Sequence, residues 1–305
     1  MEPPMQVIAD GLAFPEGPIV FPDGSLIVVE VRGERLTRIW NNRSETIASL
    51  PGGPNGAAVG PDGAIYVCNN GGAIWSGNET LNLPVAPPAD YDGGWIERVE
   101  PDTGRVDRLY TCCGTTRLSA PNDLVFDRDG GFWFTDYGKE HATSRDISGL
   151  YYATPDGGSI NQAAYGFHAL NGLGLSPDET VLYCNETATQ RVWAFDLAGP
   201  GRIEPGGPFG PQRLVASLPG IQPIDSLAMD AEGRVCAGTL VNGGITSISP
   251  DGQTEHVPIP DFMVTNICFG GADMRDAYVT LSARGGVARL RWPRPGLKLN
   301  FLSYP

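Results

Sequence analysis

Six polar residues begin six repeats, and each is followed seven positions later by an acidic residue in a turn. They are Glu16, Asn55, Asn122, Asn171, Asp225 and Asn266. The residues between are short and mostly apolar, which predicts a buried strand. A register that recurs six times indicates six copies of one structural unit. If these units surround an axis, two carboxylates and four amides meet, and such an oxygen-rich cage suits a hard divalent cation.

The repeats predict an all-β fold. The turn acids lie at positions 23, 62, 129, 178, 232 and 273, so their spacings are 39, 67, 49, 54 and 41 residues. A four-stranded propeller blade takes roughly 40–50 residues, and each turn is followed by a second apolar segment such as SLIVVEV or GFWFTDY. We therefore expect a six-bladed β-propeller with four-stranded blades around a central channel, forming a single domain over residues 1–305. A two-sheet sandwich would not explain the fixed register.

Two further segments bear on this architecture. The N-terminal segment MQVIADGL is expected to pair with the C-terminal segment GGVARLRW, which would close the ring and remove exposed strand edges. The longest spacing contains an insertion at about residues 71–95 that is rich in Gly, Pro and Asn. Long loops in compact domains are often functional, so we interpret it as a lid or rim over the channel mouth. The alternative is a surface insertion without a role.

Composition limits the partners. The formal net charge of −14 argues against nucleic acid or an anionic membrane surface, and no stretch has the ~20 apolar residues of a membrane span. Cys68, Cys184 and Cys236 fall in strand patterns and are expected to be buried free thiols, whereas the adjacent Cys112 and Cys113 leave a redox role open. Without a recognisable signal peptide, we expect a cytoplasmic monomer or small homo-oligomer that acts on a small molecule.

Several motifs carry a family resemblance. They are Phe14-Pro-Glu-Gly-Pro18, Ala120-Pro-Asn-Asp-Leu124, Leu170-Asn-Gly-Leu173, Asp225 before a Met-Asp turn, and Thr265-Asn-Ile-Cys-Phe-Gly-Gly271. Each is weak alone, but in this order they make the chain from about residue 10 to residue 290 resemble the gluconolactonase/regucalcin (senescence-marker protein) family. That family is similar to diisopropyl fluorophosphatase.

The resemblance implies one divalent metal ion in the central channel. Glu16, Asn171 and Asp225 match the family's metal ligands, and Asn122 matches a position that contacts metal or substrate. Regucalcin-type members also hold the sugar lactone with an arginine two residues before the Asn122 position. Here that residue is Ala120, and Arg117 is close but not equivalent, so the substrate is left open.

The ligand set suggests hydrolysis. A cation held by two carboxylates and neutral amides polarises an ester carbonyl and lowers the pKa of bound water. Asp225 is our candidate for the catalytic base as well as a ligand, although ligation alone or nucleophilic attack stays open. Oxygen ligands favour Ca²⁺, Mg²⁺ or Mn²⁺, and Zn²⁺ and Fe²⁺ remain candidates.

Other polar residues receive smaller roles. We expect Asn55, Asn122, Asn266 and His168 to contact the substrate. The alternative is that Asn residues at strand starts only form turns and that His168 is a hydrogen-bonded rim residue. Residues that follow or end the second strands, Asp136, Tyr137 and Glu186, are expected to lie away from the metal.

Three functions compete. The leading interpretation is a metal-dependent lactonase that opens a sugar-derived or similar hydroxylactone to the free acid. A phosphotriesterase-like hydrolase is the first alternative, because the same cage would support it. The second is a non-catalytic calcium-binding propeller, although a propeller used only for interaction needs no such ring.

Overall fold

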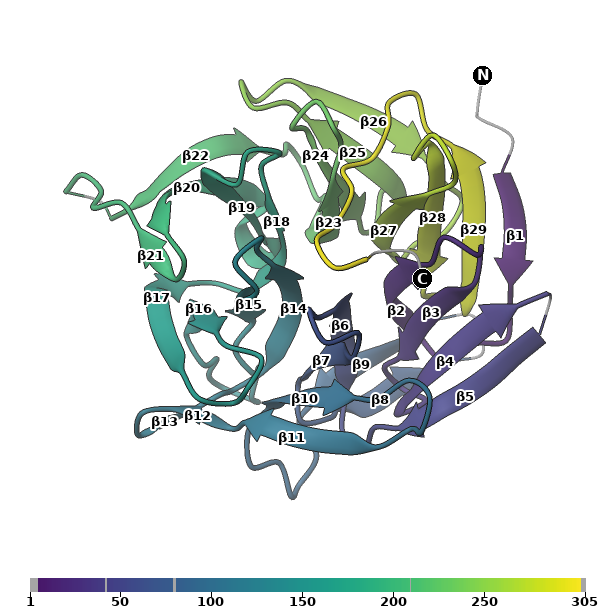
Figure 1. The fold of residues 1–305 in the computed structure, drawn as a ribbon, viewed down its shortest axis with the longest axis horizontal. Coiled ribbons are helices and arrows are strands. Elements are labelled where there is room, and N and C mark those ends of the chain that lie inside the picture. Colours follow the sequence, from purple (N-terminus) through teal and green to yellow (C-terminus); the bar gives the residue numbers. More distant parts are fainter. Residues whose placement is uncertain (1–4, 42, 79–80, 209, 303–305) are drawn as a thin grey trace.

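The computed structural model describes residues 5–41, 43–78, 81–208 and 210–302. Six antiparallel sheets surround a central channel, so the predicted six-bladed β-propeller is confirmed (Figure 1). The innermost strands of the six blades are β2 (Pro15–Val20), β6 (Pro54–Val59), β14 (Pro121–Phe126), β18 (Leu170–Leu175), β23 (Ile224–Met229) and β27 (Val264–Gly270). Among the described residues, no helix is long and apolar enough to cross a membrane.

Three further strands extend each blade outward. The second strands are β3 (Leu26–Glu30), β7 (Ile65–Asn69), β15 (Phe132–Asp136), β19 (Val181–Glu186), β24 (Val235–Thr239) and β28 (Asp276–Leu281). The third strands are β4 (Arg35–Trp40), β10 (Trp95–Val99), β16 (Ser148–Ala153), β20 (Arg191–Gly199), β25 (Gly244–Ile248) and β29 (Gly286–Arg291). The outermost strands are β5 (Arg43–Ser49), β11 (Val106–Tyr110), β17 (Ile160–Phe167), β22 (Gln212–Ser217), β26 (Thr254–Pro258) and β1 (Met5–Ala9). Apolar side chains of neighbouring blades pack into shared core clusters, so the blades hold one another in place.

The ring closes as predicted. β1, from the start of the chain, is the outermost strand of the last blade and pairs antiparallel with β29. Met5 lies opposite Leu290 and Gln6 opposite Arg289. The first and last parts of the chain therefore share one sheet, which covers an edge that would otherwise be free.

The turn acids Asp23 and Asp62 are structural, as their sequence predicts. Asp23 accepts a hydrogen bond from the Ser25 backbone N–H (2.8 Å), and Asp62 accepts one from that of Ala64 (3.2 Å). Each is followed by a glycine with positive φ, Gly24 at 85° and Gly63 at 78°. These residues end the inner strands at the mouth opposite the polar residues and form tight β-turns there.

The insertion in the second blade contains regular structure that its Gly-, Pro- and Asn-rich composition does not predict. It leaves the blade after β7 and returns at β10, but it contains a hairpin of β8 (Ile74–Gly77) and β9 (Asn82–Ala86). Trp75 on β8 packs against Phe14, with ring centroids 5.0 Å apart. Because Phe14 precedes the first inner strand, the hairpin reaches from the second blade to the rim beside Glu16. Residues 79 and 80 of the insertion lie outside the described residues.

Three smaller elements complete the description. A two-stranded sheet joins β12 (Cys112–Cys113) to β13 (Thr116–Arg117), β21 (Arg202–Ile203) pairs with β20, and a 3₁₀ turn spans Thr187–Thr189. All six cysteines are free. Cys68, Cys184 and Cys236 are buried, which confirms that prediction, whereas Cys112 is exposed and Cys113 half-buried.

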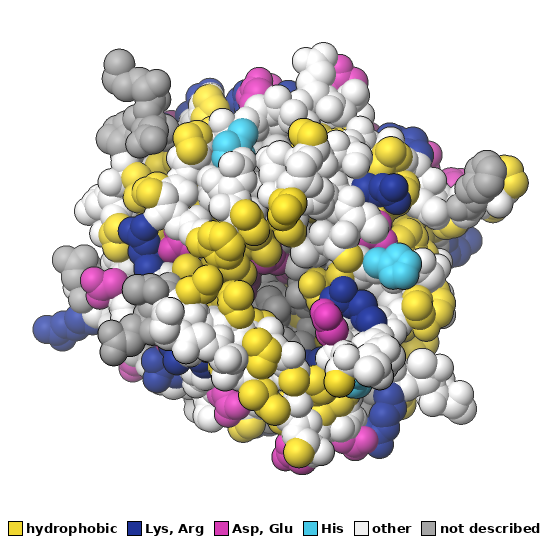
Figure 2. All heavy atoms as spheres, turned by 180° about the vertical axis from the view of Figure 1, so that it is seen from behind, with side chains coloured by type: hydrophobic (Ala, Val, Ile, Leu, Met, Phe, Trp, Pro, Cys, Tyr) yellow, Lys and Arg dark blue, Asp and Glu magenta, His cyan; other side chains and the backbone are white. Residues whose placement is uncertain are grey.

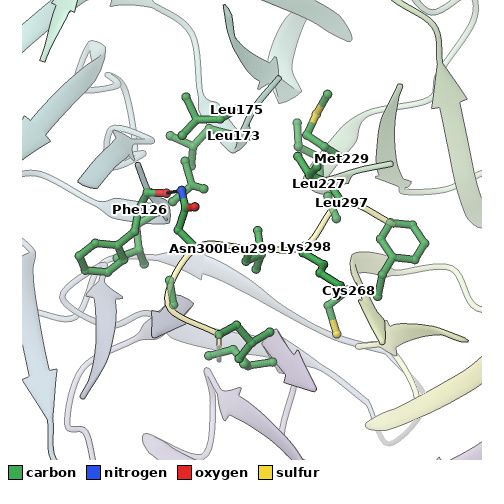
Figure 3. A pocket seen from close by; sticks show the side chains of 18 of the residues that line it. Phe126, Leu173, Leu175, Leu227, Met229, Cys268, Leu297, Lys298, Leu299 and Asn300 are labelled. Carbon is green, nitrogen blue, oxygen red and sulfur yellow. Dashed lines mark hydrogen bonds between the residues drawn. The ribbon is translucent and has the colours of Figure 1, made fainter. Parts of the chain in front are cut away.

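The channel has an apolar half at the mouth where the inner strands end. A cavity of about 270 Å³ lies there, lined by side chains such as Phe126, Leu173, Leu227 and Met229 (Figure 3). Residues 297–302 of the C-terminal segment cross this mouth (Figure 1). The segment is held by hydrogen bonds from the Asn300 side chain to the Phe126 carbonyl (3.1 Å) and to Glu179 (2.7 Å). The lining also includes Asp123 and Asn266, which lie near the start of the inner strands.

Candidate functional site

The six predicted site residues lie near the start of the six inner strands, at the mouth opposite the C-terminal segment. Four of them are buried, namely Glu16, Asn122, Asn171 and Asn266, and Asn55 and Asp225 are partly accessible. Figure 2 shows this face, which is hollowed at its centre and carries hydrophobic side chains around much of the hollow. The constant register of the sequence thus becomes a ring of polar side chains, which we call the polar ring.

The same backbone irregularity places each ring residue. In all six blades the pairing of the first and second strands shifts register at the polar position or directly after it. In the third blade, for example, Pro121 is paired with Asp136 and Leu124 with Phe134, and Asn122 falls between them. A β-bulge re-aims side chains and bends the strand. The repeated bulge therefore turns one polar side chain per blade toward the channel.

Small residues after the polar positions let the inner strands approach closely. A Cβ at Gly172 would lie 2.4 Å from the Leu227 backbone nitrogen, and one at Gly56 would lie 2.5 Å from the Asp123 Cα. These neighbours are backbone atoms and cannot move aside. Glycine at both positions is therefore a packing requirement of the narrow ring, and it explains the Asn-Gly pairs of the motifs.

Glu16 is buried and fixed from two sides. Its Oε2 accepts hydrogen bonds from the side-chain amide of Asn266 (2.9 Å) and from the backbone N–H of Gly17 (3.0 Å). Burial nevertheless raises the pKa of Glu16, and hydrogen bonds from Asn266, Thr265 and Gly17 oppose that rise. Asn266, itself a member of the polar ring, thus orients Glu16. Its side chain therefore does more than form a turn.

Asp225 is enclosed by neighbouring strands although it is partly accessible from the channel. Desolvation raises the pKa of Asp225 well above its usual value, and the nearby charges of Glu16 and Asp123 raise it further. A hydrogen bond from Asn171 opposes the rise. The charge of Glu16 thus acts on Asp225 across the ring.

A small network fixes Asn171. Its Nδ2 donates to Thr187 Oγ1 (3.1 Å), which in turn donates to the Ile224 carbonyl (2.8 Å). Ser226 Oγ donates to Asn171 Oδ1 (3.3 Å). This network ties the fourth blade to the fifth beside Asp225 and holds both side chains in one orientation.

Asn122 has an unused acceptor. Its Oδ1 is buried and has no hydrogen-bond partner among the described residues. An unsatisfied buried carbonyl costs about 1–3 kcal/mol unless a ligand or ion completes it. Asn55 is partly accessible. Its backbone carbonyl oxygen would lie only 2.6 Å from a Cβ at Gly17, so the first two inner strands are close at this point. His168 is exposed, and its backbone N–H donates to Glu186 Oε1 (2.7 Å).

Asp123 was not among the predicted site residues. It is buried between Gly56 and the fourth and fifth blades, and its Oδ1 accepts the Leu124 backbone N–H (2.9 Å). Burial, together with the charge of Glu16, raises the pKa of Asp123 to about 8. The sequence did contain a signal, since five inner strands carry Gly, Ser or Ile directly after the polar position and only this one carries an acid.

Asp136 and Glu186, which end second strands, have a structural role. Asp136 accepts the backbone N–H groups of Ser119 and Ala120, both at 2.7 Å, and Glu186 accepts that of His168. They hold the chain where it enters the inner strands. Burial raises the pKa of Tyr137, the charge of Arg145 opposes the rise, and the charge of Asp225 adds to it. Its distance from a bound metal ion stays a prediction.

Comparison with known proteins is consistent with this geometry. Residues 14–283 match the family model described as the SMP-30/gluconolactonase/LRE-like region. The chain belongs to this family. A gluconolactonase of Zymomonas mobilis is 26% identical to it, over 94% of this chain and 81% of that protein.

Solved structures show the same fold. A Xanthomonas campestris protein described as a gluconolactonase superimposes with a TM-score of 0.72 at 23% identity, covering 95% of this chain and 89% of the other. A regucalcin of Agrobacterium tumefaciens, described as a calcium-binding protein, gives 0.69 at 17% identity and covers 97% and 98%. At these identities the structural likeness establishes the propeller alone.

The polar ring of this family member has the donor set that a cation requires. Glu16, Asp123 and Asp225 interact electrostatically, and no lysine or arginine is ion-paired with them within the described chain. The described residues include no group of three or more His, Cys, Asp or Glu arranged as a metal cluster. The oxygen donors for an ion would therefore include the amides, and the free Oδ1 of Asn122 is one such donor. The residues fit a hard divalent cation.

Proposed function

We propose that this chain is a metal-dependent lactonase that opens a sugar-derived or similar hydroxylactone to the free acid. The observation that carries the proposal is the pair of interacting carboxylates, Glu16 and Asp225, at a channel mouth where Asn122 offers a buried, unpartnered oxygen. The names of the relatives support the same substrate class: gluconolactonase in Zymomonas mobilis and lactonase drp35 in Staphylococcus saprophyticus. We further propose that it acts as a single domain and as a monomer or small homo-oligomer.

Glu16, Asn122, Asn171 and Asp225 would hold the ion. A divalent cation supplies Lewis acidity toward the ester carbonyl and lowers the pKa of bound water. The neutral amides add oxygen donors without adding charge, so the ion keeps its polarising power. Ca²⁺ fits the all-oxygen donor set best, and Mg²⁺, Mn²⁺, Zn²⁺ and Fe²⁺ are tested beside it.

Each residue of the site would then have its own role in the reaction. Asp225 would accept the proton of the attacking water, because its carboxylate is partly accessible from the channel and is hydrogen-bonded to Asn171 in the ring. Asn266 keeps Glu16 oriented, and Thr187 and Ser226 keep Asn171 oriented. Asn55 and Asn122 offer amides to the oxygens of the lactone, and His168 stands exposed on the rim above Asn171.

The test combines metal analysis with a substrate screen. Purified protein is stripped with a chelator and reloaded with each of the five cations, and ring opening is followed by pH-stat on aldonolactones and on a phosphotriester. Metal-dependent opening of a lactone, with a slower phosphotriester reaction, supports the proposal. Preference for the phosphotriester would make it a phosphotriesterase, and cation binding without turnover of either substrate would make it a binding propeller.

A further inference from the structure

The loop between β15 and β16, residues 137–147, forms part of the rim around the polar ring. It follows Asp136, which pairs with the first residue of β14, and the Tyr137 N–H donates to the Ala120 carbonyl (2.9 Å). Glu140 and Arg145 form an isolated antiparallel bridge that closes the loop on itself. Charged side chains of both signs border the hollow of this face on one side (Figure 2).

This rim loop is held rigidly by its own contacts. Asp146 accepts a hydrogen bond from Ser119 Oγ (2.6 Å), and its backbone N–H donates to the Lys139 carbonyl (2.9 Å). Ser119 Oγ also accepts the Lys139 N–H (2.8 Å). Gly138 has φ of 77°, and a Cβ there would lie 2.2 Å from the Asp146 carbonyl oxygen. The loop therefore presents its side chains from a fixed backbone.

Arg145 projects from this loop with an unused donor. Its guanidinium carbon lies 4.8 Å from the centre of the Tyr137 ring, and its Nε is buried without a hydrogen-bond partner among the described residues. The nearest acid, Glu140, is 3.7 Å from Nη2 and is itself 73% exposed. A planar guanidinium seated on an aromatic ring is pre-organised to bind acceptor oxygens.

Tyr137 contacts both Arg145 and the start of β14. Its ring centre lies 4.8 Å from the Arg145 guanidinium carbon, and its backbone N–H donates to the carbonyl of Ala120, two residues before Asn122. The arginine that regucalcin-type members carry two residues before the Asn122 position is replaced by buried Ala120, which offers no donor. Arg145 belongs to a different segment, the loop that leaves β15 where Asp136 pairs with Pro121 at the start of β14.

We propose that Arg145 determines substrate specificity by binding hydroxyl oxygens of the lactone, remote from the reacting carbonyl. This inference rests on the proposed lactonase function and names its substrate class as polyhydroxylated lactones. Tyr137 acts through Arg145 as a positioning residue. Because hydroxyl binding away from the carbonyl acts on the ground state and transition state alike, Arg145 contributes to KM more than to kcat.

The test compares two lactones with the same six-membered ring: glucono-δ-lactone, which carries hydroxyls, and δ-valerolactone, which carries none. For Arg145→Gln we expect KM for glucono-δ-lactone to rise at least tenfold with kcat within threefold, and kcat/KM for δ-valerolactone to stay within twofold. Arg145→Lys keeps the charge without the planar fork and should give an intermediate KM. The matched control is Arg117→Gln, since Arg117 is an exposed rim arginine paired with Asp92.

The outcomes separate this inference from the proposed function. If the wild-type protein opens lactones and Arg145→Gln changes both substrates equally, or lowers kcat without raising KM, the role of Arg145 is overturned and the lactonase stands. If the wild-type protein opens neither lactone with any cation, both fail. If the opening of δ-valerolactone is too slow to measure, the changes in KM and kcat for glucono-δ-lactone decide whether the role of Arg145 holds. If the Arg145→Gln variant misfolds, KM and kcat for the two lactones are compared between the wild-type protein and the Arg145→Lys variant instead.

Discussion

At the scale of single residues, the polar ring concentrates negative charge that the described chain does not neutralise. Burial raises the pKa of Glu16, and the charge of Glu16 in turn raises the pKa of Asp225 and of a third carboxylate, Asp123, in addition to their own burial. Carboxylates so enclosed are stable when a cation or a proton joins them. The chemistry of the site follows from the need of these carboxylates for a bound cation or proton.

The Asp225→Asn variant tests the base and ligand roles together. We expect lactone opening to fall by at least about 10²-fold, because a general base contributes 10²–10⁴-fold and one charged ligand is lost. Unfolding should remain cooperative, since the amide is isosteric. Initial rates at saturating metal, with the bound metal measured in parallel, give the result. A rate within tenfold of the wild-type rate would show that Asp225 is neither base nor essential ligand.

The Gly172→Ala variant tests the close approach of the inner strands. The added methyl would lie 2.4 Å from the Leu227 backbone nitrogen and 2.5 Å from the Ser226 Cα, so backbone must shift. We expect a loss of about 1–3 kcal/mol in the free energy of unfolding, the usual range for overpacking, together with weaker metal binding. Gly207→Ala is the control, because a Cβ there meets nothing within 4 Å. Equal stability of the two variants in urea titrations would contradict the prediction.

At the scale of elements, the loops that rise from the second strands shape the mouth, and the inner strands supply the chemistry. The β8–β9 hairpin leans on Phe14, and the segment after it is anchored separately by Tyr91, whose hydroxyl donates to the Ser119 carbonyl (2.7 Å). The insertion at 71–95 therefore has two parts: a hairpin that can be removed, and a segment after it that is anchored to Ser119.

Replacing residues 74–86 by a short Gly-Ser turn tests whether the hairpin selects substrates. The replacement leaves Tyr91 and the four strands of the second blade intact, and loop length alone contributes only ~0.6 kcal/mol per doubling. We expect the unfolding midpoint to stay within a few degrees and the relative kcat/KM among lactones to change tenfold or more. Loss of folding would show that the hairpin is structural, and unchanged selectivity would show that it does not touch the substrate.

Lys139 in the rim loop should make stability depend on pH. Its Nζ donates to the Gly72 carbonyl (2.8 Å) and lies 4.9 Å above the Tyr91 ring. Burial lowers the pKa of Lys139 to about 8, against the opposing charges of Asp136 and Asp146. Between pH 8 and the unfolded value near 10.4, the unfolded chain binds the proton more readily than the folded chain does. The free energy of unfolding should therefore rise with pH in this window, by less than about 1.4 kcal/mol per unit.

The measurement is a series of urea titrations from pH 7.5 to 9.5 on the wild-type protein and on Lys139→Met. Methionine keeps the length of the side chain and removes the titrating group, so the variant should lack this contribution to the slope. If both proteins show the same dependence on pH, the amine of Lys139 is not desolvated in the folded protein.

At the scale of the whole molecule, the propeller depends on closure between the two ends of the chain. β1 supplies the outer edge of the last blade by pairing with β29. Without it, β29 would present unpaired backbone groups to solvent and to other copies.

Removing residues 1–9 tests this closure. We expect the unfolding midpoint to fall by several degrees, and light scattering to show association that increases with protein concentration. Removing only residues 1–4 leaves β1 intact and serves as the control. A truncated protein as stable and monodisperse as the control would show that ring closure does not depend on β1.

The sequence by itself determined the architecture and the ring. A polar residue followed at fixed distance by a turn acid, six times over, requires six equivalent strands, and equivalent strands around one axis bring their first residues together. The register of these strands can be predicted from the sequence, because it depends on neighbouring residues: those of the strand itself and those of the turn that follows it. Glu16, Asn122, Asn171 and Asp225 were found on that basis, although their roles as ligands and base remain predictions.

Only the tertiary structure decided which side chains complete the site. Asp123 looked like one more residue of a buried strand, and its position at the centre follows from the close approach of neighbouring blades at Gly56 and Gly172. Tyr137 and Arg145 belong to a loop whose direction depends on contacts with Ser119, in a different segment of the chain. The hairpin at Trp75 was likewise hidden, because its partner Phe14 is distant in sequence. Contacts between distant segments have no period, so the sequence pattern carries no record of them.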